Sequence, residues 1–167
     1  MPKGLIEWEY IDRMALYVDD MDAAVKDFEQ IFGIAPWVVL NLDAFNSKAG
    51  LSDGHIELVS PRKPGGELPT IGGNFSGPIV ALGFKVKDIE AAKKVMGDRG
   101  IDLYMGVEVE TPGGMKECML TRTKAFGGIP LSLEQYEGDS FLNAVEQNLA
   151  DDPEGYEERA KINQEGM

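Results

Sequence analysis

The stretch "IDRMALYVDDMDAAVKDFEQIFGI" (residues 11–34) returns in altered form as "IVALGFKVKDIEAAKKVMGDRGI" (residues 79–101). Each copy has a strand-like segment, an acidic turn and then apolar residues at helical spacing. Asp20 and Asp88 stand where a helix N-cap is expected, since their side chains can accept a hydrogen bond from the first turn. The repeat therefore predicts two modules of the same fold.

Each predicted helix ends near a glycine, Gly33 or Gly100, which suits a left-handed C-terminal cap. Strand-like segments follow both helices, at 36–42, 45–51 and 54–60 in the first half and at 101–109, 115–123 and 129–136 in the second. The order βαβββ thus occurs twice. Such a chain belongs to the α+β class.

The chain divides into four parts by composition. We expect a first module over 1–61, a Gly/Pro-rich linker over 62–78, a second module over 79–138 and an acidic tail over 139–167. Within the tail, apolar residues at helical spacing predict an amphipathic helix: Phe141, Leu142, Val145 and Leu149.

Charge and cysteine content limit the function. Sixteen Lys and Arg stand against 29 Asp and Glu, a formal net charge of −13. Such a surface repels nucleic acids and anionic lipid, so neither is expected as the main partner, although a local basic pocket can still take an anionic small molecule. The single cysteine, Cys118, excludes an intrachain disulfide framework. A reducing, cytoplasmic location is therefore expected.

The repeat, together with "HIELVSP" (55–61) and "LSLEQYEG" (131–138), resembles the vicinal oxygen chelate superfamily over roughly residues 9–137. That group contains glyoxalase I, methylmalonyl-CoA epimerase, extradiol dioxygenases, and the fosfomycin and bleomycin resistance proteins. The resemblance implies a mixed β-sheet that curls around a shared cavity, with the helices outside. It also implies a homodimer, to which the tail helix offers a further apolar face.

The resemblance implies a divalent metal held by the first and last strands of each module. The four matching positions here are Arg13, Glu57, Ala81 and Glu134. Arginine stays protonated and alanine carries no donor atom, so the usual metal site is degraded and no cofactor is expected. We interpret Arg13 as a fixed charge in place of the metal. The alternative is a rearranged metal site made of His55, Glu57 and Glu134.

Strand alternation predicts which side chains share the cavity. On the fourth strand His55 and Glu57 are expected on one face. The other strands are expected to direct a further set inward: Arg13, Ala15, Tyr17, Ala81, Gly83, Lys85, Ser132, Glu134 and Tyr136.

Two functions remain open. The first is a metal-independent isomerase, epimerase or lyase on an oxygenated or carbonyl metabolite, with Glu134 or Glu57 as base, His55 as a further acid or base and Arg13 binding the oxyanion. A further group is expected to orient the substrate or to pack as ordinary wall: Tyr17, Trp37, Lys85, Tyr104 and Tyr136. The second function is a non-catalytic binder of a small molecule or drug, as in bleomycin resistance.

Overall fold

The computed structural model describes residues 4–42, 47–63, 66, 79–101, 109–110, 116–120 and 125–151. Most of the linker expected at 62–78 and most of the acidic tail therefore lie outside the described residues. So does Tyr104. In the described part, no helix is long and apolar enough to cross a membrane.

The described residues of the first half form one helix and four strands. They are β1 (Trp8–Tyr17), α1 (Met21–Phe32), β2 (Trp37–Leu42), β3 (Ser47–Ser52) and β4 (Ile56–Pro61). The predicted order βαβββ is present. The strand expected at 54–60 begins later, at Ile56, because His55 has a left-handed backbone (φ 58°) that belongs to the turn before it.

The second half repeats the order. It contains β5 (Ile79–Val86), α2 (Ile89–Asp98), β6 (Val109–Glu110), β7 (Lys116–Leu120), a 3₁₀ turn (Ala125–Gly128) and β8 (Leu131–Gln135). Helix α3 (Phe141–Asp151) follows. The strand expected at 101–109 lies mostly outside the described residues, which include only its end in β6.

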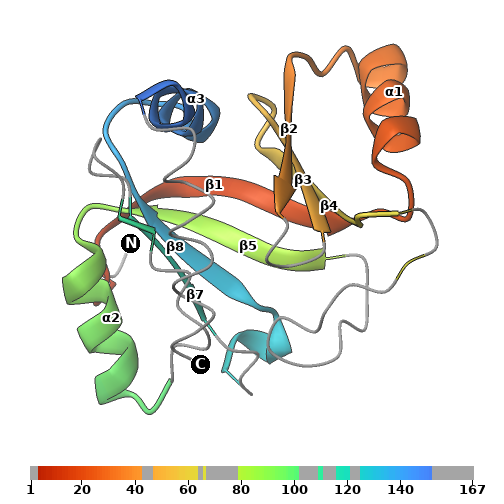
Figure 1. The fold of residues 1–167 in the computed structure, drawn as a ribbon. Helices are drawn as coiled ribbons and strands as arrows, with labels where there is room; N and C mark the ends of the chain where they lie inside the picture. Colours follow the sequence, from red (N-terminus) through yellow and green to blue (C-terminus); the bar gives the residue numbers. More distant parts are fainter. Residues whose placement is uncertain are drawn as a thin grey trace.

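All eight strands form one mixed sheet in the order β2-β3-β4-β1-β5-β8-β7-β6 (Figure 1). Within each module the first and last strands pair in parallel, β1 with β4 and β5 with β8. The two modules join where β1 and β5 pair antiparallel. The sheet curls, as the resemblance implied, and the junction of the modules lies within one chain.

The helix caps agree with the sequence pattern. The side chain of Asp20 accepts from the backbone N–H of Ala23 (3.1 Å), and Asp88 accepts from Ala91 (2.9 Å). Gly33 closes α1 in the left-handed conformation, while α2 is capped by Arg99 and Gly100 adopts that conformation one residue later.

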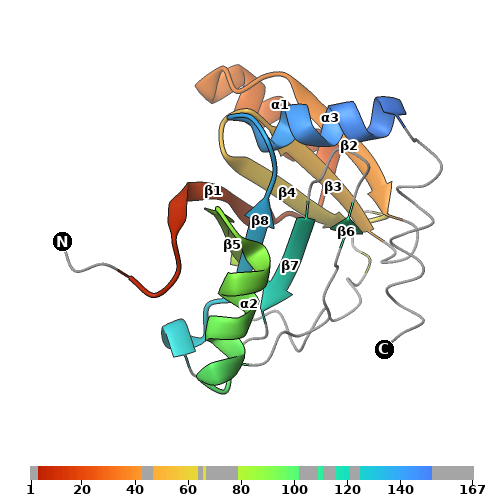
Figure 2. The same ribbon diagram turned by 90° about the vertical axis from the view of Figure 1, so that its left-hand side faces the viewer.

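Helices α1 and α2 cover the outer face of the sheet. Helix α2 packs through Ile89, Ala92 and Met96 on a core that also contains Val86, Cys118, Leu131 and Leu133. Figure 2 shows α2 lying along β5 and β8 on this side. Cys118 is buried in this core, as expected for a small apolar residue.

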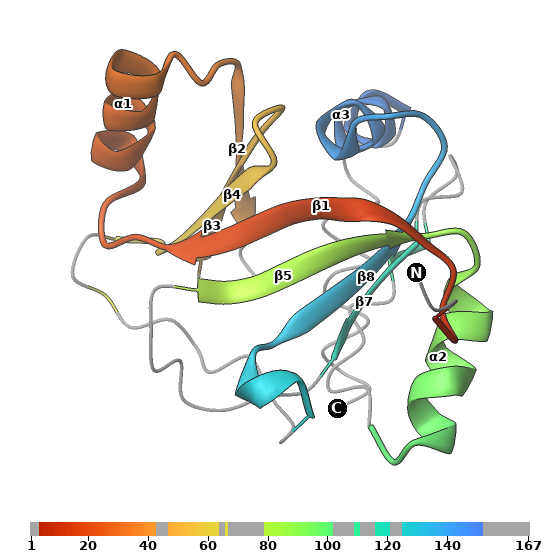
Figure 3. The same ribbon diagram turned by 180° about the vertical axis from the view of Figure 1, so that it is seen from behind.

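Helix α3 lies on the opposite face, which we call the inner face of the sheet (Figures 1 and 3). Its apolar side packs on the chain's own strands in a cluster made of Leu51, Tyr136, Phe141, Leu142 and Val145, with Val38 and Leu40 against it. The predicted amphipathic helix is present. Its apolar face is covered by the same chain, so the expectation that it offers a dimer surface is wrong for these residues.

Burial of α3 gives a direct stability prediction. Leu142 is almost fully buried, whereas Ile31 on α1 is about 70% exposed. We expect Leu142→Ala to lower the free energy of unfolding by about 2–5 kcal/mol, because a cavity replaces packed side chain. Ile31→Ala, the matched control, should change it by less than about 0.5 kcal/mol. Urea denaturation measures both, and equal effects would show that α3 is not seated in solution.

Candidate functional site

A buried arginine stands at the centre of the inner face. Its Nε donates to Oε2 of Glu57 (2.6 Å) and its Nη2 to Oε1 of Glu117 (2.5 Å). Nη1 lies 3.0 Å from Oε1 of Glu134 and 3.3 Å from Oδ2 of Asp12. We call these five residues the Arg13 cluster.

The sheet topology brings the cluster together. Strand β1 lies between β4, which carries Glu57, and β5, beyond which lies β8 with Glu134. Glu117 on β7 is the direct cross-strand neighbour of Glu134, so both side chains emerge on the same face. Arg13 therefore connects the two modules through charge as well as through the β1–β5 ladder.

Gly83 makes room for the cluster. A Cβ atom at this position would lie 2.8 Å from Oε1 of Glu134, too close for any side chain. Gly83 is paired with Arg13 on one side and with Ser132 on the other. The predicted inward face of β5 and β8 agrees with this arrangement.

Asp12 belongs to the cluster although simple alternation places it on the outer face. The β1–β5 register shifts between Ile11 and Arg13, a bulge that turns two successive side chains inward. Asp12 is about 2% exposed and accepts from the hydroxyl of Tyr136. Sequence reasoning missed Asp12 because a bulge has no clear signal in a single strand pattern.

Glu117 was also missed, but its signal was present. Cys118 is apolar and packs on the helix side, so alternation directs Glu117 inward. The resemblance drew attention only to the first and last strands of each module. The alternation of side chains along the strand expected at 115–123 was sufficient to identify Glu117 as facing inward.

The carboxyl groups of the cluster bind protons more strongly than usual, chiefly because they are buried. Burial raises the pKa of Glu134 to about 8, although Arg13 acts against this, and Glu117 raises it further. Burial also raises the pKa of Glu117. Burial alone would lower the pKa of Arg13, but the surrounding carboxylates hold it well above its ordinary value. One carboxyl oxygen, Oε2 of Glu134, is buried and has no hydrogen-bond partner among the described residues.

Tyr136 and Lys85 form a second layer beside the cluster. The hydroxyl of Tyr136 lies 3.0 Å from that of Tyr10, and burial with the Asp12 hydrogen bond raises the pKa of Tyr136. The Nζ of Lys85 lies 4.3 Å from the centre of the Tyr136 ring, donates to the carbonyl of Gly138 and lies 3.2 Å from Glu9. Both predicted residues thus lie on the inner face.

His55 does not share a strand face with Glu57, contrary to the prediction. It precedes β4, and its Nδ1 lies 2.5 Å from the backbone carbonyl oxygen of Asp12. A carbonyl only accepts, so Nδ1 carries a proton and donates it to this contact. The ring also meets that of Tyr10 edge to face.

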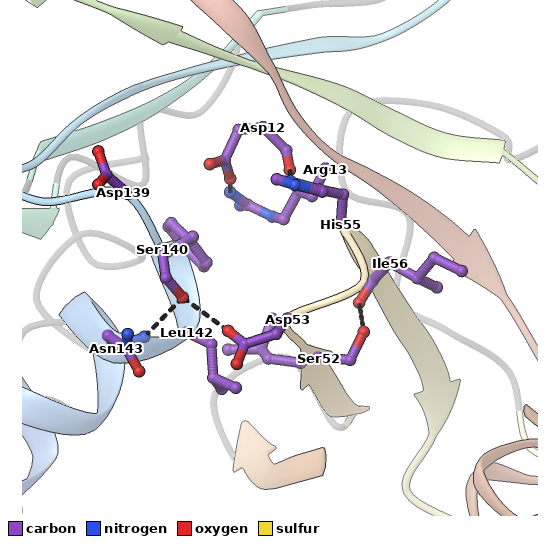
Figure 4. Close-up of a pocket in the computed structure, with 12 residues that line it drawn as sticks. Asp12, Arg13, Ser52, Asp53, His55, Ile56, Asp139, Ser140, Leu142 and Asn143 are labelled. Atoms are coloured by element: carbon purple, nitrogen blue, oxygen red, sulfur yellow. Dashed lines mark hydrogen bonds and ion pairs between the residues drawn. The ribbon is translucent and has the colours of Figure 1, made fainter. Parts of the chain in front are cut away.

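A polar cavity of about 190 Å³ opens beside the cluster (Figure 4). It lies between the β3–β4 turn and the start of α3. Two of its lining residues, Asp12 and Arg13, belong to the Arg13 cluster, and a third, His55, contacts the backbone of Asp12. The remaining lining residues are Leu51, Ser52, Asp53, Ile56, Asp139, Ser140, Phe141, Leu142 and Asn143.

Two of the predicted substrate-binding residues lie elsewhere. Trp37 packs against Phe28 of α1, and its indole N–H donates to the carbonyl of Ile34 (2.8 Å). Tyr17 packs against a small apolar cluster that includes Ala15 and Ala81. Neither lines the cavity, because α1 draws Trp37 to the outer face and Tyr17 lies farther along β1.

The residues present do not fit the divalent metal that the resemblance implies. The guanidinium nitrogens of Arg13 occupy the contacts to Glu57 and Glu134 that a metal would need. Ala81 offers no ligand atom, and His55 lies in the turn before β4, off the strand that carries Glu57. Among the described residues, no group of three or more His, Cys, Asp or Glu is placed to hold a metal ion.

Solved structures with the same arrangement exist. Methylmalonyl-CoA epimerase from Mycobacterium tuberculosis superposes with a TM-score of 0.63 at 16% identity, over 83% of this chain and 93% of that one. A variant of the Streptomyces coelicolor methylmalonyl-CoA epimerase, in complex with 2-nitronate-propionyl-CoA, gives 0.62 at 15% identity, over 80% and 99%. No protein-family model and no curated protein matches the sequence.

This chain has the vicinal oxygen chelate fold. The superposition extends over nearly the whole length of the solved structures and places both modules in that arrangement. At these identities the likeness concerns the fold, and the chemistry of the site has to be argued from its own residues.

The raised pKa of Glu134 predicts how stability depends on pH. A carboxyl that is protonated in the fold up to about pH 8, but ionises near 4.5 when unfolded, stabilises the fold most at low pH. That contribution is lost as the pH rises from about 4.5 through 8. We expect the melting temperature to fall over this range and Glu134→Gln to flatten the fall. The exposed Glu29→Gln should leave the profile as in the wild type, and an unchanged profile in Glu134→Gln would contradict the assignment.

Removing the Arg13 guanidinium should show how strongly the buried carboxylates destabilise the fold when they have no cation. We expect Arg13→Met to lower the free energy of unfolding by about 3–5 kcal/mol at pH 8, because buried carboxylates lose their cation. At pH 5 the loss should be smaller, since the carboxyls can take up protons. Adding Glu134→Gln to Arg13→Met should recover part of the loss at pH 8. Urea denaturation of both variants at the two pH values tests this, and additive losses would refute it.

Proposed function

We propose that the chain is an acid–base enzyme of the isomerase or epimerase type, acting on a small carbonyl metabolite. The observation that carries the proposal is the convergence of Asp12, Arg13 and His55 on one polar cavity of the inner face. A buried carboxylate, a fixed cation and an imidazole are the groups that proton transfer next to a carbonyl requires. The fold neighbours are methylmalonyl-CoA epimerases, which supports the reaction class.

The geometry supports one role for each residue. Asp12 accepts the proton from the carbon next to the carbonyl; the C–H electron pair becomes the carbon–carbon double bond of the enolate, and the carbonyl π pair moves to oxygen. The positive charge of Arg13 stabilises the resulting enolate oxygen. His55, whose Nδ1 is held by the Asp12 carbonyl, delivers to carbon a proton taken from solvent, and Asp12 then releases its own proton to solvent, which restores both groups.

The glutamates that the sequence suggested as bases take another role in this proposal. Glu57 and Glu134 do not line the cavity, and Glu134 is 0% exposed. Both hold the guanidinium by ion pairs of 2.6 and 3.0 Å. Together with Glu117 they are positioning residues, which fix Arg13 beside the cavity.

A specific observation also supports the second function, a non-catalytic binder. Four contacts from Arg13 are directed at carboxylates of the chain itself, so its charge is largely paired without a ligand. A binder would use the cavity for recognition alone. The two functions differ in whether a bound carbonyl compound loses its proton to solvent.

Proton exchange in D₂O distinguishes them. We expect the wild type to replace the hydrogen next to the carbonyl of a substrate by deuterium, which proton NMR follows as loss of signal. The panel comprises hydroxyacetone, glyceraldehyde, methylmalonate and methylmalonyl-CoA. Asp12→Asn and His55→Gln should each slow exchange by about 100-fold or more, the usual contribution of an acid or base.

Glu29→Gln on α1 is the matched control and should exchange at the wild-type rate. Glu57→Gln should retain exchange at a lower rate, because Arg13 loses one of the ion pairs that position it. Binding of a compound without exchange above the buffer rate would establish the binder in place of the enzyme. Exchange that is unaffected by Asp12→Asn would overturn the assignment of the base.

A further inference from the structure

The inner face of the sheet, where this site lies, is largely occupied by the chain's own helix. The ring of Phe141 on α3 lies 3.8 Å from the guanidinium carbon of Arg13, a stacked cation–π contact. Leu142 and Val145 are buried against β2 and β3 on the same face. Figure 4 shows the first turn of α3 forming one side of the cavity.

Polar contacts fix this end of the helix. The hydroxyl of Ser140 donates to Oδ1 of Asp53 in the β3–β4 turn (2.7 Å) and accepts from the backbone N–H of Asn143 (3.2 Å). Ser140 is therefore the N-cap of α3 and at the same time its link to the opposite wall. The position of Phe141 on Arg13 is set by that link.

The space that α3 leaves is small. The cavity of about 190 Å³ has room for about six waters, at about 30 Å³ each. Sites for drug-sized ligands usually have about 300–1,000 Å³. A compact metabolite fits in this space, whereas a coenzyme A thioester is larger than the cavity.

The charge of the lining selects against anions. Asp12, Asp53 and Asp139 line the cavity with Arg13 as its cation, and Arg13 already contacts four carboxylates. The whole chain carries −13. Carboxylate and carbonyl acceptors instead suit hydroxyl groups of a neutral ligand, which donate to them.

The solved structures that share this fold include a complex of methylmalonyl-CoA epimerase with 2-nitronate-propionyl-CoA.

We infer that α3 restricts the site to compact, neutral hydroxycarbonyl compounds and excludes anionic thioesters of the coenzyme A type. The inference rests on the proposed function for the reaction at the site, but it concerns which molecules can enter the cavity. Phe141 is the specificity-determining residue, because its ring covers the guanidinium and lines the cavity.

Binding and exchange with defined probes test this separately from the proposed reaction. Saturation-transfer NMR on the full chain compares hydroxyacetone and glyceraldehyde with methylmalonate and methylmalonyl-CoA. We expect the wild type to bind the first pair at least about tenfold more tightly than the second, a difference of about 1.4 kcal/mol. Phe141→Ala should reduce that preference by enlarging the cavity, while Phe28→Ala on the outer face should not.

The outcomes separate the two proposals. Wild-type binding of methylmalonyl-CoA equal to or tighter than that of glyceraldehyde overturns the inference, and exchange of its proton would at the same time support the proposed function. Binding of the neutral compounds without exchange supports the inference and removes the enzyme. Binding of none of the four probes overturns the inference, as does a preference that Phe141→Ala leaves unchanged.

A disulfide that holds α3 in place provides a second test, which leaves the Phe141 ring intact. Asp53→Cys/Ser140→Cys places two thiols where the native hydrogen bond joins the walls. With the disulfide formed, the preference for neutral compounds should be retained or increased. Reduction of the same protein should lower it, and a locked protein that gains binding of methylmalonyl-CoA would contradict the inference.

Discussion

The structure depends on one buried guanidinium. Arg13 stands on the strand that joins the two modules and contacts carboxylates from β4, β7 and β8 as well as its own neighbour Asp12. Taking these charged groups out of water costs free energy. If one ion pair is broken, an uncompensated charge remains buried, so the pairs depend on one another. The β1–β5 register, the bulge at Asp12 and the glycine at position 83 all serve that requirement.

The cluster also explains the position of α3. Four carboxylates point toward the inner face, which by itself gives that face an excess of negative charge and of unpaired polar atoms. The ring of Phe141 covers the guanidinium with a surface that its charge attracts, and the helix seals the apolar part of β2 and β3 beside it. The charged centre and the apolar cover are thus parts of the same arrangement.

Much of the fold could be predicted from the sequence, because the repeat and its caps are local signals. The acidic N-caps, the inward glutamates on β4 and β8 and the amphipathic helix after residue 139 were all visible as patterns. The errors have physical causes. A bulge turned Asp12 inward against alternation, and a left-handed residue removed His55 from its strand. The covered face of α3 was misassigned to a partner because periodicity shows that a face is apolar but not what lies on it.

A side-chain cation such as Arg13 differs from a bound metal ion in what it can do at a site. The guanidinium cannot leave, its charge does not vary with pH in the working range, and its N–H groups have fixed directions. The protonation of the cluster therefore has to be adjusted at the carboxyl groups, which is where burial raises the pKa values of Glu134 and Glu117. Glu134, whose pKa is raised to about 8, can thereby hold a proton beside a permanent positive charge.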